Sequence, residues 1–402
     1  MPNRPHFKYF LSHTNQSVQA DSEIWSAPIP LSRKPLEGKA GIFVSHGDYF
    51  LAARDFLQKD DFKAIALAVS QQTRRKITFE EIEEIRIVLA KHGKFYHPAR
   101  IETVLKGLTI PLVLNVAVSG AGINYIKREY KLLDKLNTDF PFSFLPRVFG
   151  RDCVYSKSAD LEISMFLGEW LTGYNEFHLS RDPADDKAKI IVWDCERGKY
   201  FLTADQTIEL YRQAARILTA YYNVETFKHI HSWHHAAGDF VVKCENNKID
   251  VKLITVRQYR PMFAMDKEIK PENQDAFMVL EALLVFFLNL AIRMRLDRID
   301  GTGDIVWLDD LAVQGIPKGF FEGLALNPSV ASLPGALRDC FRKHLLSCSQ
   351  SDLFDLSQAV VDAYNPQSPE NSVIRKNLKR HATILFNAIQ QKQDIRASVC
   401  QL

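Results

Sequence analysis

The segment between residues 229 and 257 constrains the fold more than any other part of this sequence. It holds two apolar runs, Phe240-Val241-Val242 and Ile249 to Ile254, and the second alternates with polar residues. Such alternation is typical of a half-buried β-strand. Glu245-Asn246-Asn247-Lys248 lies between the runs and is a turn signal, because asparagine tolerates a positive φ. The sequence therefore predicts a β-hairpin here.

A polar loop rich in histidine precedes this predicted hairpin. It contains His229, His231, His234 and His235, and Asp239 follows directly before the first strand. An imidazole with a pKa near ~6.5 accepts a proton at neutral pH, which makes His234 a candidate general base. The alternative is that His234 only forms hydrogen bonds within the loop. Asp239 is either a metal ligand or a residue that accepts backbone N–H bonds at the start of the strand.

The two runs Gly238-Asp239-Phe240-Val241-Val242 and Val251-Lys252-Leu253-Ile254-Thr255 resemble the catalytic segment of the protein-kinase-like fold. The resemblance is to the small-molecule branch, the aminoglycoside and choline kinases, with H-G-D-x-x-x-x-N, a strand, a turn and a strand ending in L-I-D. By this alignment His234 replaces the catalytic aspartate, Asp239 the amide ligand, and Thr255 the metal-binding carboxylate. In the family these groups orient the acceptor hydroxyl and hold Mg²⁺ on the phosphates.

The resemblance extends upstream. Leu112-Val113-Leu114-Asn115-Val116 aligns with the family strand L-V-L-K-V, so Asn115 stands where the family has a phosphate-binding lysine. The helix expected from Asn124 to Leu136 carries Glu129, at the place of the glutamate that pairs with that lysine. The segment Leu167 to Tyr174 corresponds to the hinge that receives adenine. The resemblance therefore implies that ATP contacts Asn115, Glu129, Gly168, Glu169, Trp170 and Thr255.

The expected fold is α+β, with the two lobes of the protein-kinase-like fold. Residues 94–170 are expected to form the small antiparallel-sheet lobe. Residues 171–402 are expected to form a larger, mostly helical lobe that holds the catalytic-loop-like segment. Residues 1–93 are expected to be an N-terminal extension with two helices, irregular as far as residue 40. A chain of 402 residues suits two such units.

Local patterns predict the elements on either side of residue 100. A helix is expected from Tyr49 to Gln71 and a second from Phe79 to His92, because Thr78 and Glu81 have capping-box spacing. A hairpin is expected next, with strands at 101–104 and 111–118 and a turn near Gly107.

Further along the chain, the patterns predict another hairpin and then helices. Its strands are expected at 189–193 and 199–202, followed by a helix from Thr203 to about Tyr222, which the spacing of Thr203 and Gln206 caps. Beyond Asn273 only helices are expected.

Three further stretches leave alternatives open. Ser119-Gly120-Ala121-Gly122 is either a backbone cradle for phosphate or a strand-to-helix turn, and the turn is favoured because no glycine-rich nucleotide motif occurs. The acidic stretch Asp297 to Asp304 is interpreted as a turn, since it lacks the calcium-loop spacing. The apolar run Ala276 to Ile292 is interpreted as a buried helix, because it is shorter than a membrane span.

Composition limits the partners and the compartment. The net charge is only +3, and no basic tract predicts nucleic-acid binding. The six cysteines are scattered, without a CxxC pair, and the N-terminus has no apolar core of a signal peptide. We therefore expect a cytoplasmic protein with a nucleotide and a small-molecule acceptor as partners, and neither nucleic acid nor membrane. The oligomeric state does not follow from the sequence.

Three functions follow, in order of preference. The first is an atypical ATP-dependent phosphotransferase acting on a small-molecule hydroxyl, with His234 as base and Asp239 on Mg²⁺. The second is a pseudokinase, a nucleotide-binding or scaffolding protein without turnover. The third is a metal-dependent hydrolase, since residues 229–235 are superficially similar to the H-x-H-x-D-H signature of metallo-β-lactamase-like enzymes, although Trp233 stands at its aspartate.

Overall fold

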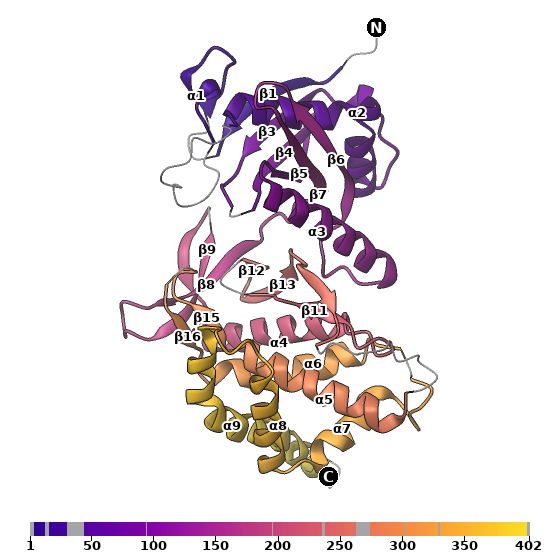
Figure 1. Cartoon of the computed structure of the whole chain (residues 1–402), viewed down its shortest axis with the longest axis vertical. Helices are drawn as coiled ribbons and strands as arrows, with labels where there is room; N and C mark the ends of the chain where they lie inside the picture. The colour runs from indigo at the N-terminus through magenta and orange to yellow at the C-terminus, as the bar shows by residue number, and fades with distance from the viewer. Residues whose placement is uncertain are drawn as a thin grey trace. The chain divides into compact units, whose positions relative to one another are not determined.

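The computed structural model describes residues 4–12, 16–29, 44–93, 95–194, 196–234, 238–262, 274–301, 303–328 and 330–399. The chain forms two compact units, Met1–Thr172 and Gly173–Leu402 (Figure 1). Both units combine helices with sheets whose strands are mostly antiparallel. The predicted α+β class is therefore confirmed.

The first unit is built on a seven-stranded sheet with the order β2-β1-β3-β4-β5-β7-β6. All neighbouring strands are antiparallel except β1 and β3, which are parallel. The strands are β1 (His6–Leu11), β2 (Gln16–Ser17), β3 (Glu84–Leu89), β4 (His97–Leu105), β5 (Leu108–Ala117), β6 (Val148–Ser156) and β7 (Leu161–Glu169). The helices are α1 (Glu23–Ser26), α2 (His46–Thr73), the 3₁₀ turn η1 (Phe79–Glu81) and α3 (Gly120–Asp139).

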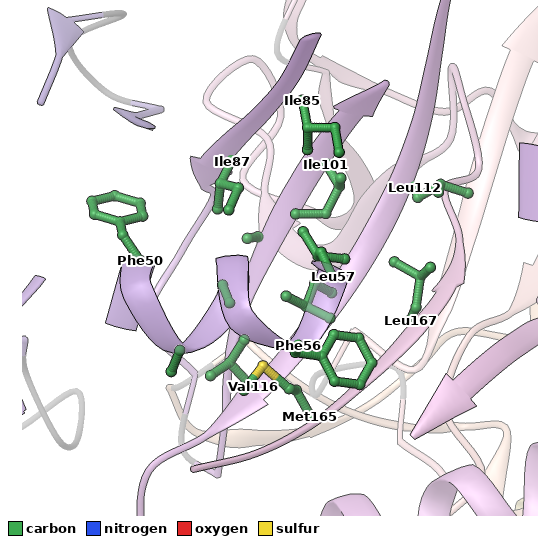
Figure 2. Close-up of a cluster of buried hydrophobic side chains, with 14 of the residues drawn as sticks. Phe50, Phe56, Leu57, Ile85, Ile87, Ile101, Leu112, Val116, Met165 and Leu167 are labelled. Atoms are coloured by element: carbon green, nitrogen blue, oxygen red, sulfur yellow. The ribbon is translucent and has the colours of Figure 1, made fainter. Parts of the chain in front are cut away.

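The main core of the first unit lies between α2 and one face of the sheet. Figure 2 shows Phe50, Phe56 and Leu57 of α2 directed toward the strands. Alternate residues of each strand meet them, because successive side chains of a strand point to opposite faces. The strand residues labelled in this cluster are Ile85, Ile87, Ile101, Leu112, Val116, Met165 and Leu167.

The opposite face of this sheet faces α3. Tyr130 of α3 packs against Phe166 of β7, with ring centroids 5.9 Å apart. Phe166 is the cross-strand partner of Asn115 on β5. Since directly opposed residues share a face, Asn115 lies on the α3 side of the sheet.

The prediction of a helix from Phe79 to His92 is wrong. The capping box of Thr78 and Glu81 does form, but it caps only the 3₁₀ turn η1. Strand β3 follows, and it pairs with β1 on one side and β4 on the other. Its Ile- and Val-rich sequence suits a pleated, half-buried surface, and pairing on both edges outweighs the local helix signal.

The prediction of an irregular N-terminus is also wrong for residues 6–11, which form β1 within the sheet. Residues 30–43 lie outside the described residues. The helix predicted at 49–71 forms within α2, but as two helical segments, because residues 59–62 have non-helical φ and ψ. The hairpin is confirmed as β4 and β5, which turn at Lys106 and Gly107 with φ of 43° and 83°. The helix carrying Glu129 is confirmed within α3.

The second unit contains a five-stranded antiparallel sheet with the order β10-β9-β8-β12-β13. Its other strands form two short pairs, β11 with β14 and β15 with β16. The strands are β8 (Asn175–Arg181), β9 (Ala188–Asp194), β10 (Gly198–Phe201), β11 (His229–His231), β12 (Phe240–Glu245), β13 (Lys248–Leu253), β14 (Gln258–Arg260), β15 (Leu296–Arg298) and β16 (Ile305–Trp307). The helices are α4 (Ala204–Ala220), α5 (Ala276–Arg293), α6 (Leu311–Leu324), α7 (Leu337–Ser347), α8 (Gln350–Asp362) and α9 (Glu370–Val399).

The hairpin predicted after the histidine-rich loop is confirmed as β12 and β13. Asn246 and Asn247 form its turn with φ of 49° and 62°. Helix α4, also predicted, holds the hairpin from one side. Gln213 of α4 donates to the carbonyl of Ile249 at 2.8 Å and accepts from the N–H of Val251 at 2.9 Å. The second predicted hairpin is confirmed as β9 and β10.

The prediction of helices alone beyond Asn273 is wrong in one place. The pair β15 and β16 interrupts the helices, and the acidic stretch Asp297 to Asp304 spans its turn, apart from residue 302, which is not described. Helix α5 is the one described helix that is long and apolar enough to cross a membrane. More than half of it, 56%, is buried inside the protein, as in the core helix of a globular unit.

Candidate functional site

The hairpin of β12 and β13 places Asp239 in the interior of the second unit. Phe240, Val242 and Leu253 are fully buried, and they draw the start of β12 inward. The carbonyl of Asp239 accepts from the N–H of Ile254 at 2.7 Å, which extends the hairpin by one more bond. As a result the side chain of Asp239 is only 1% exposed.

The carboxylate of Asp239 is held by an ion pair. Its Oδ1 accepts from Nη2 of Arg257 at 2.5 Å, and its Oδ2 accepts from Nη1 of the same guanidinium. The backbone N–H of His234 also donates to Oδ2, at 2.8 Å. Burial raises the pKa of Asp239 to about 6, against the opposing effect of Arg257. This two-pronged geometry is the strong form of an arginine–carboxylate contact.

The sequence analysis predicts that Asp239 holds Mg²⁺, with Thr255 at the position of the family's second metal-binding carboxylate, and the surroundings of Asp239 do not fit that ion. Both oxygens of Asp239 already accept from the positively charged guanidinium of Arg257, and Oδ2 also accepts from the backbone N–H of His234. Thr255 offers only a neutral hydroxyl, whereas Mg²⁺ is normally held by one or two carboxylates. Among the residues that the structure describes, no group of three or more His, Cys, Asp or Glu side chains is placed to hold a metal.

His234 lies beside a second arginine. Its Nε2 is 3.1 Å from Nη2 of Arg293 on α5, and 3.9 Å from a carboxylate oxygen of Glu370 on α9. Burial, followed by the charge of Arg293, lowers the pKa of His234 to about 4. Because a guanidinium only donates, Nε2 of the neutral ring must accept, and the ring proton is then on Nδ1. The lone pair that a general base would use is therefore engaged.

The other histidines of the cluster have different surroundings. His229 is buried against Tyr222 and Phe286, with ring centroids 6.3 and 5.0 Å away. His231 is half-buried, and its Nδ1 is 3.2 Å from the hydroxyl of Ser232. Burial lowers the pKa of both to about 4. His235 lies outside the described residues.

The residues assigned to ATP in the first unit fall into two groups. Asn115 on β5 and Glu129 on α3 belong to the side of the sheet that α3 covers, and Glu129 is buried.

The second group lies at the end of β7, where Gly168 and Glu169 are the last residues of the strand and Trp170 follows. The N–H of Glu169 donates to the carbonyl of Arg147 at 2.9 Å, and its carboxylate accepts from the N–H of that arginine at 3.1 Å. The guanidinium of Arg100 lies over Trp170 at 5.9 Å.

The loop before α3 acts as a helix cap. The hydroxyl of Ser119 accepts from the N–H of Gly122 at 3.2 Å. The carbonyl oxygen of Phe95 lies 2.0 Å from the point where a Cβ on Gly122 would be. Space next to this turn is thus taken by the protein's own backbone, in agreement with the interpretation of the segment as a turn.

Sequence reasoning missed three residues of the loop's surroundings, Arg257, Arg293 and Glu370. Only Arg257 carried a usable signal, as a cation two positions after Thr255. Arg293 and Glu370 come from α5 and α9, and no local pattern links them to residue 234. Comparison of the sequence with family models finds no match, and comparison with curated proteins finds none either.

Proposed function

We propose that this chain is a pseudokinase-type binding protein, which has a protein-kinase-like fold but does not transfer phosphate. The observation that carries the proposal is the ion pair of Arg257 with Asp239. Phosphoryl transfer depends on metal ions that bridge and neutralise the phosphates. An arginine on the carboxylate that would bind the metal competes directly with that role.

The kinase-like part of the proposal is supported by the order of elements. A strand with Asn115 is followed by a helix with buried Glu129 and then by two strands, β6 and β7. The second unit continues with the strands β8, β9 and β10, and then with α4, the loop with His234, and the hairpin of β12 and β13. This is the order that the resemblance implies, with hinge, helix, catalytic loop and hairpin in succession.

The phosphotransferase alternative is disfavoured by the state of its assigned residues. A base with a pKa of about 4 and an occupied lone pair is a poor acceptor for a hydroxyl proton. His234 therefore suits a structural role in its loop better than the role of a general base. Asp239, which accepts the N–H of His234, suits the role of a structural residue at the start of β12.

The test is turnover measured next to binding. Purified protein with ATP and Mg²⁺ is expected to release no ADP above a protein-free blank. A ligand that binds only the folded state at a hundredfold excess over Kd stabilises it by about 2.7 kcal/mol, which a thermal shift detects. ATP is expected to give the same shift in Mg²⁺ and in EDTA.

A double variant, Thr255→Asp with Arg257→Gln, provides the positive control. This variant leaves Asp239 without its ion-pair partner and adds a second carboxylate. The thermal shift that ATP causes is therefore expected to become dependent on Mg²⁺. Thr255→Asn with Arg257→Gln is the matched variant without the added charge. Mg²⁺-dependent ATP consumption by the natural chain, abolished by Asp239→Asn and by His234→Ala, would establish the phosphotransferase instead.

A further inference from the structure

Arginine side chains gather around the histidine loop of the second unit in two arrangements. Arg257 has a carboxylate partner, Asp239, and also donates to the carbonyl of Ser232 at 2.9 Å. Within the described residues, the hydrogen bonds of Arg260, Arg293 and Arg298 go to neutral acceptors, although the charge of Arg293 also acts on Glu370. These acceptors are the amide of Gln258 at 2.8 Å, the ring of His234 at 3.1 Å and the carbonyl of Gly303 at 3.1 Å.

The pairing of β11 with β14 brings Arg260 to the histidines. His229 is opposite Arg260, and His231 is opposite Gln258. Since opposed and alternate residues share one face of a ladder, these four side chains lie on the same face. Nε of Arg260 donates to Gln258, which directs the guanidinium along the ladder toward His231. On this face Arg260 is exposed and His231 is half-buried, whereas His229 is buried.

Helix α5 contributes Arg293 at its last turn. Its guanidinium contacts His234, and the carboxylate near this ring belongs to Glu370, 3.9 Å from Nε2. The charges of Arg260 and Arg293 act on His231 in the same direction as burial, and both help to lower its pKa. At His234 the charges of Arg293, Arg257 and Arg298 also lower the pKa, and the charge of Glu370 raises it. The charged groups that act on these two rings are therefore mostly arginines.

From this arrangement we propose that Arg260, Arg293 and His231 together bind a phosphate group directly and without a metal ion. The inference rests on the proposed function and names its ligand chemistry. Guanidinium groups suit phosphate because their N–H donors match its oxygens in pairs. In such a site the arginines supply the positive charge that Mg²⁺ supplies in a phosphotransferase.

The test is a calorimetric titration of the full chain in EDTA with pyrophosphate, ATP and adenosine. Pyrophosphate and ATP are expected to bind and adenosine is not, and raised salt is expected to weaken binding because the contacts are ionic. Pyrophosphate binding as tight as ATP binding identifies the phosphate as the recognised group. Binding of adenosine equal to that of ATP would overturn the proposal.

Variants locate the site. Arg260→Gln and Arg293→Gln are each expected to raise the Kd for pyrophosphate roughly tenfold, because each removes a charged hydrogen-bond donor. The matched control is Arg338→Gln, an exposed arginine of the same unit whose partner is Asp339. Arg260 is exposed, so its variant is expected to fold normally, and circular dichroism checks both variants.

Three outcomes separate this inference from the proposed function. Unchanged affinity in both variants, or no binding of pyrophosphate in EDTA, overturns the inference and leaves the absence of turnover as it is. Turnover of ATP with Mg²⁺ overturns the proposed function, whether or not pyrophosphate binds in EDTA. Loss of affinity in Arg338→Gln equal to that in the two variants would show a general charge effect and overturn the site.

Discussion

The sheet core of the first unit and the histidine loop of the second unit are both buried, but different forces hold them. The core is apolar, with Leu112 and Met165 fully inaccessible on one side of the sheet. The loop buries Asp239 and His229, which water would otherwise solvate. Apolar burial is favourable by itself, whereas a buried charge is tolerated only when it is paired and hydrogen-bonded.

This difference predicts how each region responds to change. Loss of an apolar side chain leaves a cavity, and its cost depends on volume but hardly on pH. Loss of one member of an ion pair leaves its partner charged in a poorly solvated place. The stability of the loop should therefore depend on charge and pH, and the stability of the core should depend on the size of its side chains.

The largest effect is expected from Arg257→Leu, which leaves the buried carboxylate of Asp239 without its counter-charge. Breaking a buried pair in this way costs about 3–5 kcal/mol. Urea denaturation of the variant measures the change in the free energy of unfolding. Arg375→Leu is the matched control, since Arg375 pairs with Asp362 on the surface and is 50% exposed. A surface pair is worth only about 0–1 kcal/mol, and equal losses in the two variants would refute the distinction.

The next effect is expected from Leu112→Ala on β5, at a side chain that is 0% exposed. Removing such a side chain costs about 2–5 kcal/mol through lost burial and the cavity that remains. Leu108→Ala on the same strand is the control, because Leu108 is 53% exposed. Urea denaturation at pH 5.5 and pH 7.5 is expected to give the same loss for Leu112→Ala at both pH values. A strong pH dependence of this loss would contradict the distinction between the core and the loop.

The smallest effect at neutral pH is expected from His229→Phe, which keeps an aromatic ring against Tyr222 and Phe286. Burial lowers the pKa of His229 to about 4, so the unfolded chain binds a proton between about pH 6.5 and pH 4 that the folded chain does not. His229 therefore stabilises less as the pH falls, by about 2–3 kcal/mol from neutral pH to pH 4.5.

The variant is expected to show a shallower loss of stability in acid than the natural chain, measured by urea denaturation from pH 7.5 to pH 4.5. Asp239→Asn gives the opposite comparison. Because the pKa of Asp239 is raised to about 6, the folded chain holds its proton where the unfolded chain releases it, and the loss of that group steepens the decline in acid. Parallel pH profiles for His229→Phe and the natural chain would exclude this role for His229.

Sequence alone determined the elements whose signals are local. The hairpin of β12 and β13 follows from alternation and from the turn residues Asn246 and Asn247. Helix α4 follows from its capping box and periodic apolar residues, and α5 from its long apolar run. These patterns need no distant partner, since turn geometry and helix periodicity are properties of neighbouring residues.

Only the tertiary structure decided what surrounds the loop and what β3 becomes. Residues 84–89 form a strand because β1 and β4 lie on either side of them, although the local signal indicated a helix. Arg257 meets Asp239, and Arg293 meets His234, through packing of separate elements. Hydrogen bonds and ion pairs act between groups that are close in space, and a sequence of residue types does not specify that closeness. The sequence therefore determines which residue types stand in the loop, whereas the folded chain determines which partners they meet.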